Sequence, residues 1–276
     1  MTTENPLGRQ TEYPAQYAPD VLFPVPRADN RLQLSCTNPL PFSGHDIWHA
    51  YELSWLDGQE MPQVGIARLA VPQDSPNLIE SKSLKLYFNS LNQSRFADRT
   101  QLRETLVRDL SAAAQADIGV ELLAVDGLPA GDTVLAGGIR LEAHPVVAAG
   151  REPAPGLLKA DAGRAVREAL YSHLFRSNCP VTGQPDWGTV IIRYEGGAID
   201  HGGLLRYVLS YRQHQGFHED CVERIFCDLW TRCEPQWLVV GIQFLRRGGL
   251  DINPWRWSAG VPEGVVPGEG MRLTRQ

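Results

Sequence analysis

The stretch LIESKSLKLYFNS, residues 78–90, sets the pattern for the rest of the chain. An acid, a hydroxyl and a lysine stand together in it, at Glu80-Ser81-Lys82. Apolar residues follow three or four positions apart, at Leu84, Tyr87, Phe88 and Leu91. This spacing predicts a helix with one apolar face, and it puts Glu80 to Lys82 at the helix N-terminus, where unpaired N–H groups and the dipole favour anions. Because Ser and Glu are also common at ordinary helix starts, the three residues form either a cap or a binding site.

The composition is that of an ordinary globular protein. The chain has 276 residues, which suggests about two domains, with 43% hydrophobic and 21% charged residues. A net charge of −6 argues against a surface for nucleic acid. No signal peptide is visible, and no apolar run approaches the roughly 20 residues that span a bilayer. We therefore expect a cytoplasmic protein that binds neither membranes nor, directly, nucleic acid.

The five cysteines form no metal-binding or disulfide pattern. They are Cys36, Cys179, Cys221, Cys227 and Cys233, and no two of them are spaced as CxxC. We therefore predict no metal site and no disulfide framework.

The same order of elements, strand, strand, helix, helix and strand, is predicted twice. In the first half these elements cover residues 51–55, 64–71, 80–92, 98–116 and 120–125. In the second half they cover residues 170–175, 187–194, 204–214, 218–233 and 237–245. An extended arm, residues 1–35, precedes them, and a Gly/Pro/Ala-rich region, residues 127–156, separates the halves. We predict two domains, residues 1–145 and 146–276.

The two halves align as a tandem repeat with an offset of 121 residues. Residues 79–96 then lie on residues 200–217 without a gap. In this register the second half has His201-Gly202-Gly203 in place of Glu80-Ser81-Lys82, and the first half has no counterpart of His218-Glu219. Each half has therefore kept a different part of one site, which predicts a composite site between the domains or between chains.

Cys179 is the strongest candidate nucleophile. It follows a predicted strand within a polar loop, where a thiolate can face a pocket, although many cysteines are simply small buried residues. Cys221, Cys227 and Cys233 lie six residues apart on one helix and point in different directions, so we assign them structural roles.

Three further residues of the second half could act with Cys179. Asp186 could be a general acid or base, or it could cap a turn. His218 begins a helix and would allow Cys–His catalysis. The carboxylate of Glu219, like that of Glu80, could accept the ring N–H and the exocyclic amine of a guanine-like edge together.

The Arg246-Arg247-Gly248-Gly249 segment is a candidate phosphate site. Paired guanidiniums and a close backbone approach suit phosphates, but a solvated basic turn has the same composition. The chain has no G-x-G-x-x-G after a strand, so a dinucleotide would not be held by a Rossmann unit.

With these residues in view, the chain closely resembles the long, two-module form of the QueF family, the NADPH-dependent 7-cyano-7-deazaguanine reductases. The resemblance rests on motifs that run in family order over most of residues 45–257. They are ESKSLKLY at 80–87, SNC at 177–179, QPDWG at 184–188, FHE at 217–219 and RRGGLDINPW at 246–255.

The resemblance implies an α+β architecture of tandem tunnelling-fold (T-fold) modules, each an antiparallel sheet with two helices on one face, which assemble into oligomers. We expect a homodimer. The implied reaction reduces a nitrile to a primary amine with two NADPH, in queuosine biosynthesis. Cys179 would form a covalent thioimide, and Asp186 would supply the proton to nitrogen.

The same resemblance assigns the binding residues. The deazaguanine substrate would be bound by His218 and Glu219, and by Ile79, Glu80 and Ser81 of the other module. NADPH would be bound by Ser81, Lys82, Arg247 and Gly248.

Two other functions are compatible with these residues. A Cys–His hydrolase or cyclohydrolase-like T-fold enzyme acting on a purine or pterin would need neither Lys82 nor Arg247, and would turn over without NADPH. In a non-catalytic purine-binding module, Cys179 would be dispensable.

Overall fold

The protein has an α+β fold that divides into two compact units. The computed structural model describes residues 13–36, 39–126, 135–144, 146, 150, 152–266, 272–273 and 275–276. Unit 1 consists of residues 1–30, 45–128 and 246–252, and unit 2 of residues 31–44, 129–245 and 253–276. Each predicted domain was one continuous stretch of the chain, whereas each unit is made of three separate stretches. The predicted boundary between residues 145 and 146 cannot be compared directly, because residue 145 lies outside the described residues.

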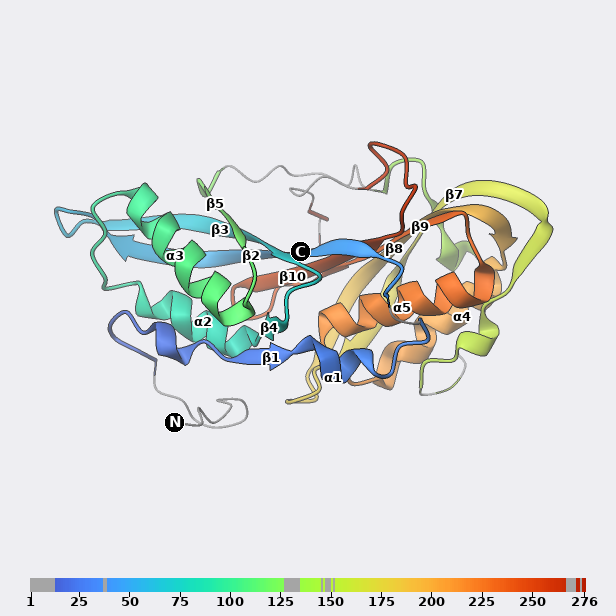
Figure 1. Cartoon of the computed structure of the whole chain (residues 1–276), viewed down its shortest axis with the longest axis horizontal. Coiled ribbons are helices and arrows are strands. Elements are labelled where there is room, and N and C mark those ends of the chain that lie inside the picture. The colour runs from blue at the N-terminus through green and yellow to red at the C-terminus, as the bar shows by residue number, and fades with distance from the viewer. Residues whose placement is uncertain are drawn as a thin grey trace. The chain divides into compact units, whose positions relative to one another are not determined.

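Unit 1 contains antiparallel strands with two helices beside them (Figure 1). Its sheet has the strand order β5 (Gly119–Leu123), β3 (Pro62–Pro72) and β2 (Ser43–Leu56). The helices are α2 (Ser81–Ser90) and α3 (Arg99–Ala114), and their apolar faces join the strands in one core. Three short elements precede them, a 3-10 turn η1 (Pro19–Val21), β1 (Pro24–Pro26) and α1 (Arg27–Arg31), and β1 pairs with β4 (Asn77–Ile79).

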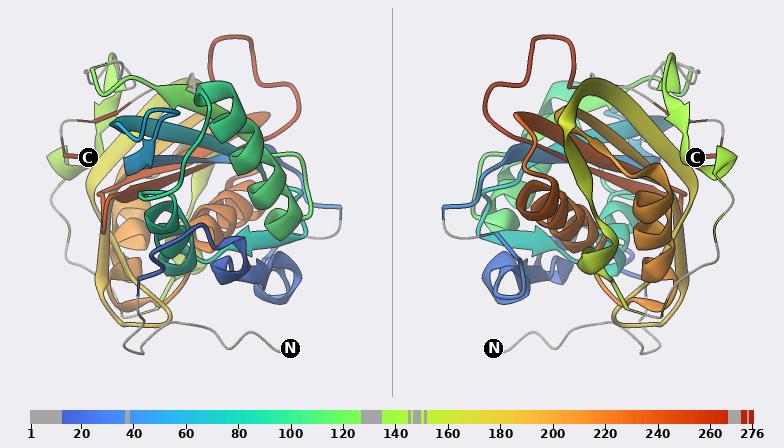
Figure 2. Two further views of the ribbon diagram at one scale, coloured as in Figure 1. Left: turned by 90° about the vertical axis from the view of Figure 1, so that its left-hand side faces the viewer. Right: turned by 90° about the vertical axis from the view of Figure 1, so that its right-hand side faces the viewer.

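Unit 2 has longer strands and the same pairing of helices. The strand order is β9 (Trp237–Phe244), β8 (Pro185–Ile199), β7 (Ala160–Asn178) and β6 (Ile139–Arg140). On its other side, β9 pairs with the last three residues of β10 (Leu250–Trp257). Helices α4 (His201–Ser210) and α5 (His218–Cys233) lie side by side on one side of these strands, as the right-hand view of Figure 2 shows. Three 3-10 turns complete the unit: η3 (Leu141–Ala143), η4 (Pro155–Leu157) and η5 (Tyr211–Gln213).

The predicted order of elements is confirmed, although the structure adds two short strands, β4 and β6, that were not predicted. Strand β10 was not predicted, because Pro254 lacks the N–H that a central strand uses. Residues 13–35 are not simply extended, since they include η1, β1 and α1. Among the described residues, no helix is both long and apolar enough to cross a membrane.

Buried polar contacts recur in the two units and correct the register of the repeat. Tyr87 donates a hydrogen bond to Asp109 at 2.6 Å, and Tyr207 donates one to Asp228 at 2.6 Å. The helix caps Glu80 and Asp200 are likewise equivalent. Glu80/Asp200 and Tyr87/Tyr207 are 120 residues apart, whereas Asp109/Asp228 are 119 apart, so the predicted constant offset of 121 is wrong by one for the first helices and by two for the second. The register was ambiguous in sequence because α4 carries adjacent apolar pairs, Leu204-Leu205 and Val208-Leu209, which match α2 at either offset.

The prediction that the chain has no disulfide is also wrong. Cys36 and Cys227 form a disulfide with a Cα–Cα distance of 5.1 Å. The two cysteines are 191 positions apart in sequence, and only folding brings them together.

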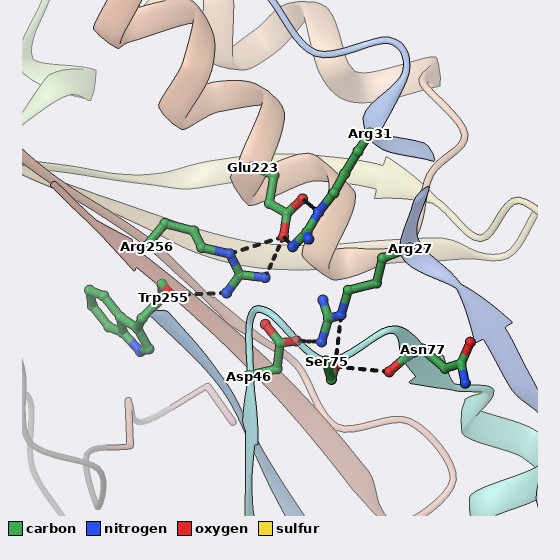
Figure 3. A network of polar contacts seen from close by, with 8 residues as sticks. All are labelled: Arg27, Arg31, Asp46, Ser75, Asn77, Glu223, Trp255 and Arg256. Atoms are coloured by element: carbon green, nitrogen blue, oxygen red, sulfur yellow. Dashed lines mark hydrogen bonds and ion pairs between the residues drawn. The ribbon is translucent and has the colours of Figure 1, made fainter. Parts of the chain in front are cut away.

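A buried carboxylate holds the segment 31–44 against α5 (Figure 3). Glu223 accepts hydrogen bonds from Arg31 Nε at 2.8 Å and Nη2 at 2.7 Å, and from Arg256 Nε at 3.1 Å and Nη2 at 2.8 Å. The side chains of Glu223 and Arg256 are 2% and 0% exposed. Because charges this deeply buried must be paired, Glu223 ties α5 to both the segment and β10.

We predict that Glu223→Ala lowers the free energy of unfolding by about 3–5 kcal/mol, because it leaves Arg256 buried without its carboxylate. Urea unfolding followed by tryptophan fluorescence measures this change. Glu121→Ala is the control, since Glu121 pairs with Arg68 but is 50% exposed, and we expect a loss of less than about 1 kcal/mol. Equal losses in the two variants would contradict the prediction.

Candidate active site

The hairpin of β7 and β8 places Cys179 and Asp186 at one end of unit 2. Cys179 directly follows β7; its N–H donates to Gln184 O at 2.8 Å, and Gly183 N–H donates to Cys179 O at 3.0 Å. Gly183 has φ +67°, which glycine adopts without strain. Asp186 pairs with Ser177 across the strands, and Cys179 and Asp186 are 7% and 6% exposed. The backbone therefore brings the predicted nucleophile and proton donor to the same hairpin end.

The loop before α5 brings His218 to the same place. Asn178 N–H donates to His214 O at 2.8 Å, and Gly216 N–H donates to Asn178 O at 3.2 Å, so the loop runs along the end of β7. His218 Nε2 lies 3.5 Å from Asp186 Oδ2. Glu219 follows at the start of α5 and is 3% exposed. In unit 2, the structure thus collects Cys179, Asp186, His218 and Glu219.

Phe244, which was not predicted, orients His218. The two rings are stacked, with centroids 3.7 Å apart and planes 5° apart. Phe244 N–H donates to Asn253 Oδ1 at 3.1 Å, and Gln276 Nε2 donates to Phe244 O at 3.1 Å and to Asn253 Oδ1 at 2.7 Å. These contacts join separate segments of the chain, and no motif in the sequence predicted them.

Cys221 lies close to this site but is not suited to act as a nucleophile. It is fully buried on α5, and burial is the main cause that raises the pKa of its thiol, with the charge of Asp220 and those of Asp186 and Glu219 adding to the effect. Burial likewise raises the pKa of Cys233 to about 11. Both thiols are protonated at neutral pH, in keeping with the structural roles predicted for them.

In unit 1, the predicted residues lie at the start of α2, and Glu80 caps the helix. Its carboxylate accepts the N–H groups of Lys82 and Ser83, both at 2.8 Å, and it is 3% exposed. The predicted unpaired N–H groups are therefore largely occupied, and an anion here would depend on the side chains of Ser81 and Lys82. Ile79 is buried at the end of β4, immediately before the cap.

The Arg246–Gly249 segment forms a tight turn in the same unit. Arg247 and Leu250 exchange backbone hydrogen bonds of 2.8 and 3.2 Å, and the two glycines between them have φ +61° and +79°. Two positive φ angles in a row define a type I′ turn, which Gly-Gly forms readily. A Cβ on Gly248 would lie 3.3 Å from Lys85 Nζ, so the turn packs closely against α2.

The two groups of residues have different chemistry. The group in unit 2 combines a thiol, a carboxyl and an imidazole, which suits covalent and proton-transfer chemistry. The group in unit 1 consists of the glycine turn and Lys85, which lies against Gly248 and pairs with Glu52 at 3.4 Å, while Lys82 stands in the first turn of the same helix. Among the described residues, no cluster of three or more His, Cys, Asp or Glu could hold a metal ion.

Comparisons with known proteins identify the family. A family model described as nitrile reductase, 7-cyano-7-deazaguanine-reductase N-term, matches residues 13–122, and one described as QueF-like protein matches residues 185–261. A Stenotrophomonas maltophilia protein named NADPH-dependent 7-cyano-7-deazaguanine reductase is 51% identical over 277 residues, covering 99% of this chain and 98% of the relative. The chain belongs to the QueF family.

A second relative agrees with this membership of the QueF family. A Bordetella pertussis protein of the same name is 50% identical over 251 residues, covering 91% of this chain and 92% of the relative. A crystal structure of the archaeosine synthase QueF-Like in the apo form matches with a TM-score of 0.31 and 22% identity, covering 36% of this chain and 96% of that chain. Asp186 and His218 lie in the range of the second family model, whereas Cys179 lies outside the ranges of both family models but within the alignments to both relatives.

We predict that iodoacetamide spares Cys221 and Cys233 in the native protein from pH 7 to pH 9. A thiol with a pKa near 11 is only about 1% thiolate at pH 9, and the fully buried Cys221 has its pKa raised as well. Peptide mass spectrometry measures the labelling, and the urea-unfolded protein, in which both cysteines react, is the control. Rapid native labelling of Cys221 at pH 7 would be incompatible with this account.

Proposed function

We propose that the chain catalyses the NADPH-dependent reduction of the nitrile of 7-cyano-7-deazaguanine to the primary amine, as an oxidoreductase of queuosine biosynthesis. The observation that carries the proposal is the hairpin end at which Cys179, Asp186 and His218 gather. It occurs in a chain about half identical, over nearly its whole length, to proteins named for this reaction.

Cys179 is the proposed nucleophile. A nitrile is a poor hydride acceptor. Addition of the Cys179 thiolate to its carbon forms a C–S bond, and one π electron pair of the C≡N triple bond moves to nitrogen. Asp186 donates a proton to that nitrogen, which gives a neutral thioimide. The position of His218 beside Asp186, fixed by the Phe244 ring, supports an ordered proton donor at this place.

The deazaguanine ring is proposed to be bound by His218 and Glu219, with Ile79, Glu80 and Ser81. Glu219 is buried at the start of α5, where its carboxylate could accept two N–H groups of a guanine-like edge. Glu80 already accepts two backbone N–H groups, but a carboxylate has about four acceptor positions and can accept more. The cap would therefore fix the carboxylate in place before the substrate arrives.

NADPH is proposed to contact Ser81, Lys82, Arg247 and Gly248. When bound, two NADPH in succession would supply the two hydrides that convert the thioimide to the amine and release Cys179. The turn at Gly248 presents backbone without a Cβ, and Lys82 and Arg247 supply positive charge for phosphate groups.

The recurring contacts of the two units support a duplicated architecture. We propose that the chain consists of tandem T-fold modules, with limits near residues 1–145 and 146–276, and that it acts as a homodimer. The equivalent Tyr87–Asp109 and Tyr207–Asp228 pairs, each joining two helices, are the strongest support for the duplication.

We predict that Cys179→Ala abolishes both the covalent adduct and nitrile-dependent NADPH oxidation, because in the proposed reaction the sulfur of Cys179 forms the bond to the nitrile carbon. Intact mass spectrometry of protein mixed with 7-cyano-7-deazaguanine, without NADPH, measures the adduct. Cys233→Ala, which removes a thiol from the far end of α5, should retain it. Absence of an adduct in the unchanged protein would favour the purine-binding alternative, and turnover without NADPH would favour the hydrolase.

We predict that Asp186→Asn lowers kcat by about 10²- to 10⁴-fold, because the amide keeps the shape of the side chain but cannot donate the acidic proton. Steady-state NADPH oxidation measures kcat. Asp200→Asn is the matched control, since Asp200 caps α4 and Asn caps a helix equally well. A kcat within threefold of the unchanged protein for Asp186→Asn would rule out this role.

A further inference from the structure

A bulge in β2 lies next to the Arg246–Gly249 turn. Ala50 pairs with Ala67 and Leu53 pairs with Gly65, so that two residues of β2, Tyr51 and Glu52, face a single residue of β3. A bulge of this kind bends the strand and changes where its side chains point. Here it turns both residues toward the glycine turn of the same unit.

The bulge residues hold the turn through backbone and side chain. Tyr51 N–H donates to Gly249 O at 2.9 Å, and the Arg246 guanidinium lies over the Tyr51 ring with Cζ 4.5 Å from the centroid. The carboxyl end of Glu52 packs against Gly249, so that a Cβ there would displace it. Tyr51 therefore fixes both the turn's carbonyl and the side chain of its first arginine.

The orientation of Tyr51 is itself fixed by two buried residues. Its hydroxyl donates to Asp251 Oδ2, and His49 Nδ1 lies 2.7 Å from Asp251 Oδ1. His49 and Asp251 are each 1% exposed. Asp251 stands two residues after the turn on β10, so the network runs from β2 through Tyr51 and back to the turn.

We propose that Tyr51 is a positioning residue for NADPH, and that it acts through the Arg246–Gly249 turn. The proposal rests on the proposed function, in which Arg247 and Gly248 contact the cofactor. An arginine side chain and a glycine turn lose much conformational freedom when they bind phosphate, and a turn already held in place loses less. Stacking of Arg246 on an aromatic ring and the hydrogen bond to Gly249 supply this order before NADPH binds.

Two variants separate the ring from its hydroxyl. In Tyr51→Leu the ring under Arg246 is lost, and the dissociation constant for NADPH should rise about tenfold, in line with a cation–π contact. Tyr51→Phe keeps the ring but loses the hydrogen bond to Asp251, and the dissociation constant for NADPH should rise about threefold. NADPH fluorescence titration measures binding, and intact mass after mixing with 7-cyano-7-deazaguanine alone measures adduct formation at Cys179, which should not change.

Tyr17→Phe is the matched control, because the Tyr17 hydroxyl of the same unit also donates to a carboxylate, that of Asp109. Its NADPH affinity should equal that of the unchanged protein. If the NADPH affinity of Tyr51→Leu is within twofold of that of the unchanged protein, the proposal is overturned. It is also overturned if Tyr51→Leu loses adduct formation as much as NADPH affinity, because such a loss indicates a general role in stability. If the unchanged protein forms the adduct but binds no NADPH, the proposed cofactor site fails, and the positioning role is overturned with it.

Discussion

The buried carboxylate of Glu223 is the contact on which much of unit 2 depends. Two guanidiniums, from Arg31 and Arg256, converge on it, and the innermost of the three side chains has no exposed surface. Removing such charges from water costs several kcal/mol each unless every one is paired. Segment 31–44, helix α5 and the end of β10 therefore have to be in place together.

Helix α5 connects this constraint to the chemistry. It carries Glu223 and Cys227 on the side that meets segment 31–44, and it begins with His218 and Glu219. Fixing the helix thereby fixes where its first turn lies relative to the β7–β8 hairpin. In unit 1, another buried pair, Arg27 and Asp46, joins the N-terminal segment to β2, with Ser75 accepting from Arg27 at 3.0 Å (Figure 3). In both units, a charged contact in the interior fixes a chain segment that local propensity leaves undefined.

The periodicity of the sequence was enough to place most helices and strands. Helix α5 has the limits that were predicted, 218–233, and α2 and α3 differ from prediction by one or two residues at each end. Apolar spacing determines these elements because each buries one face. It could not find β10, whose proline argues against a strand. It also missed the offsets of the repeat, because the adjacent apolar pairs Leu204-Leu205 and Val208-Leu209 match the first half in more than one register. The Cys36–Cys227 bond was missed for a different reason, because pairing over so long a separation follows from the tertiary fold alone.

For the candidate site, the sequence by itself determined which residue types are available: a thiol after a strand, an aspartate seven positions on, a histidine at a helix start and a glycine turn preceded by two arginines. Motif order also pointed to the QueF family. Only the tertiary structure decided what these residues contact. In it, His218 stacks on Phe244, the Glu80 carboxylate accepts backbone N–H groups of the helix that it caps, and the bulge of β2 lies beside the turn. The geometry of such contacts depends on how distant segments of the chain pair and pack. Local sequence therefore carries little information about them.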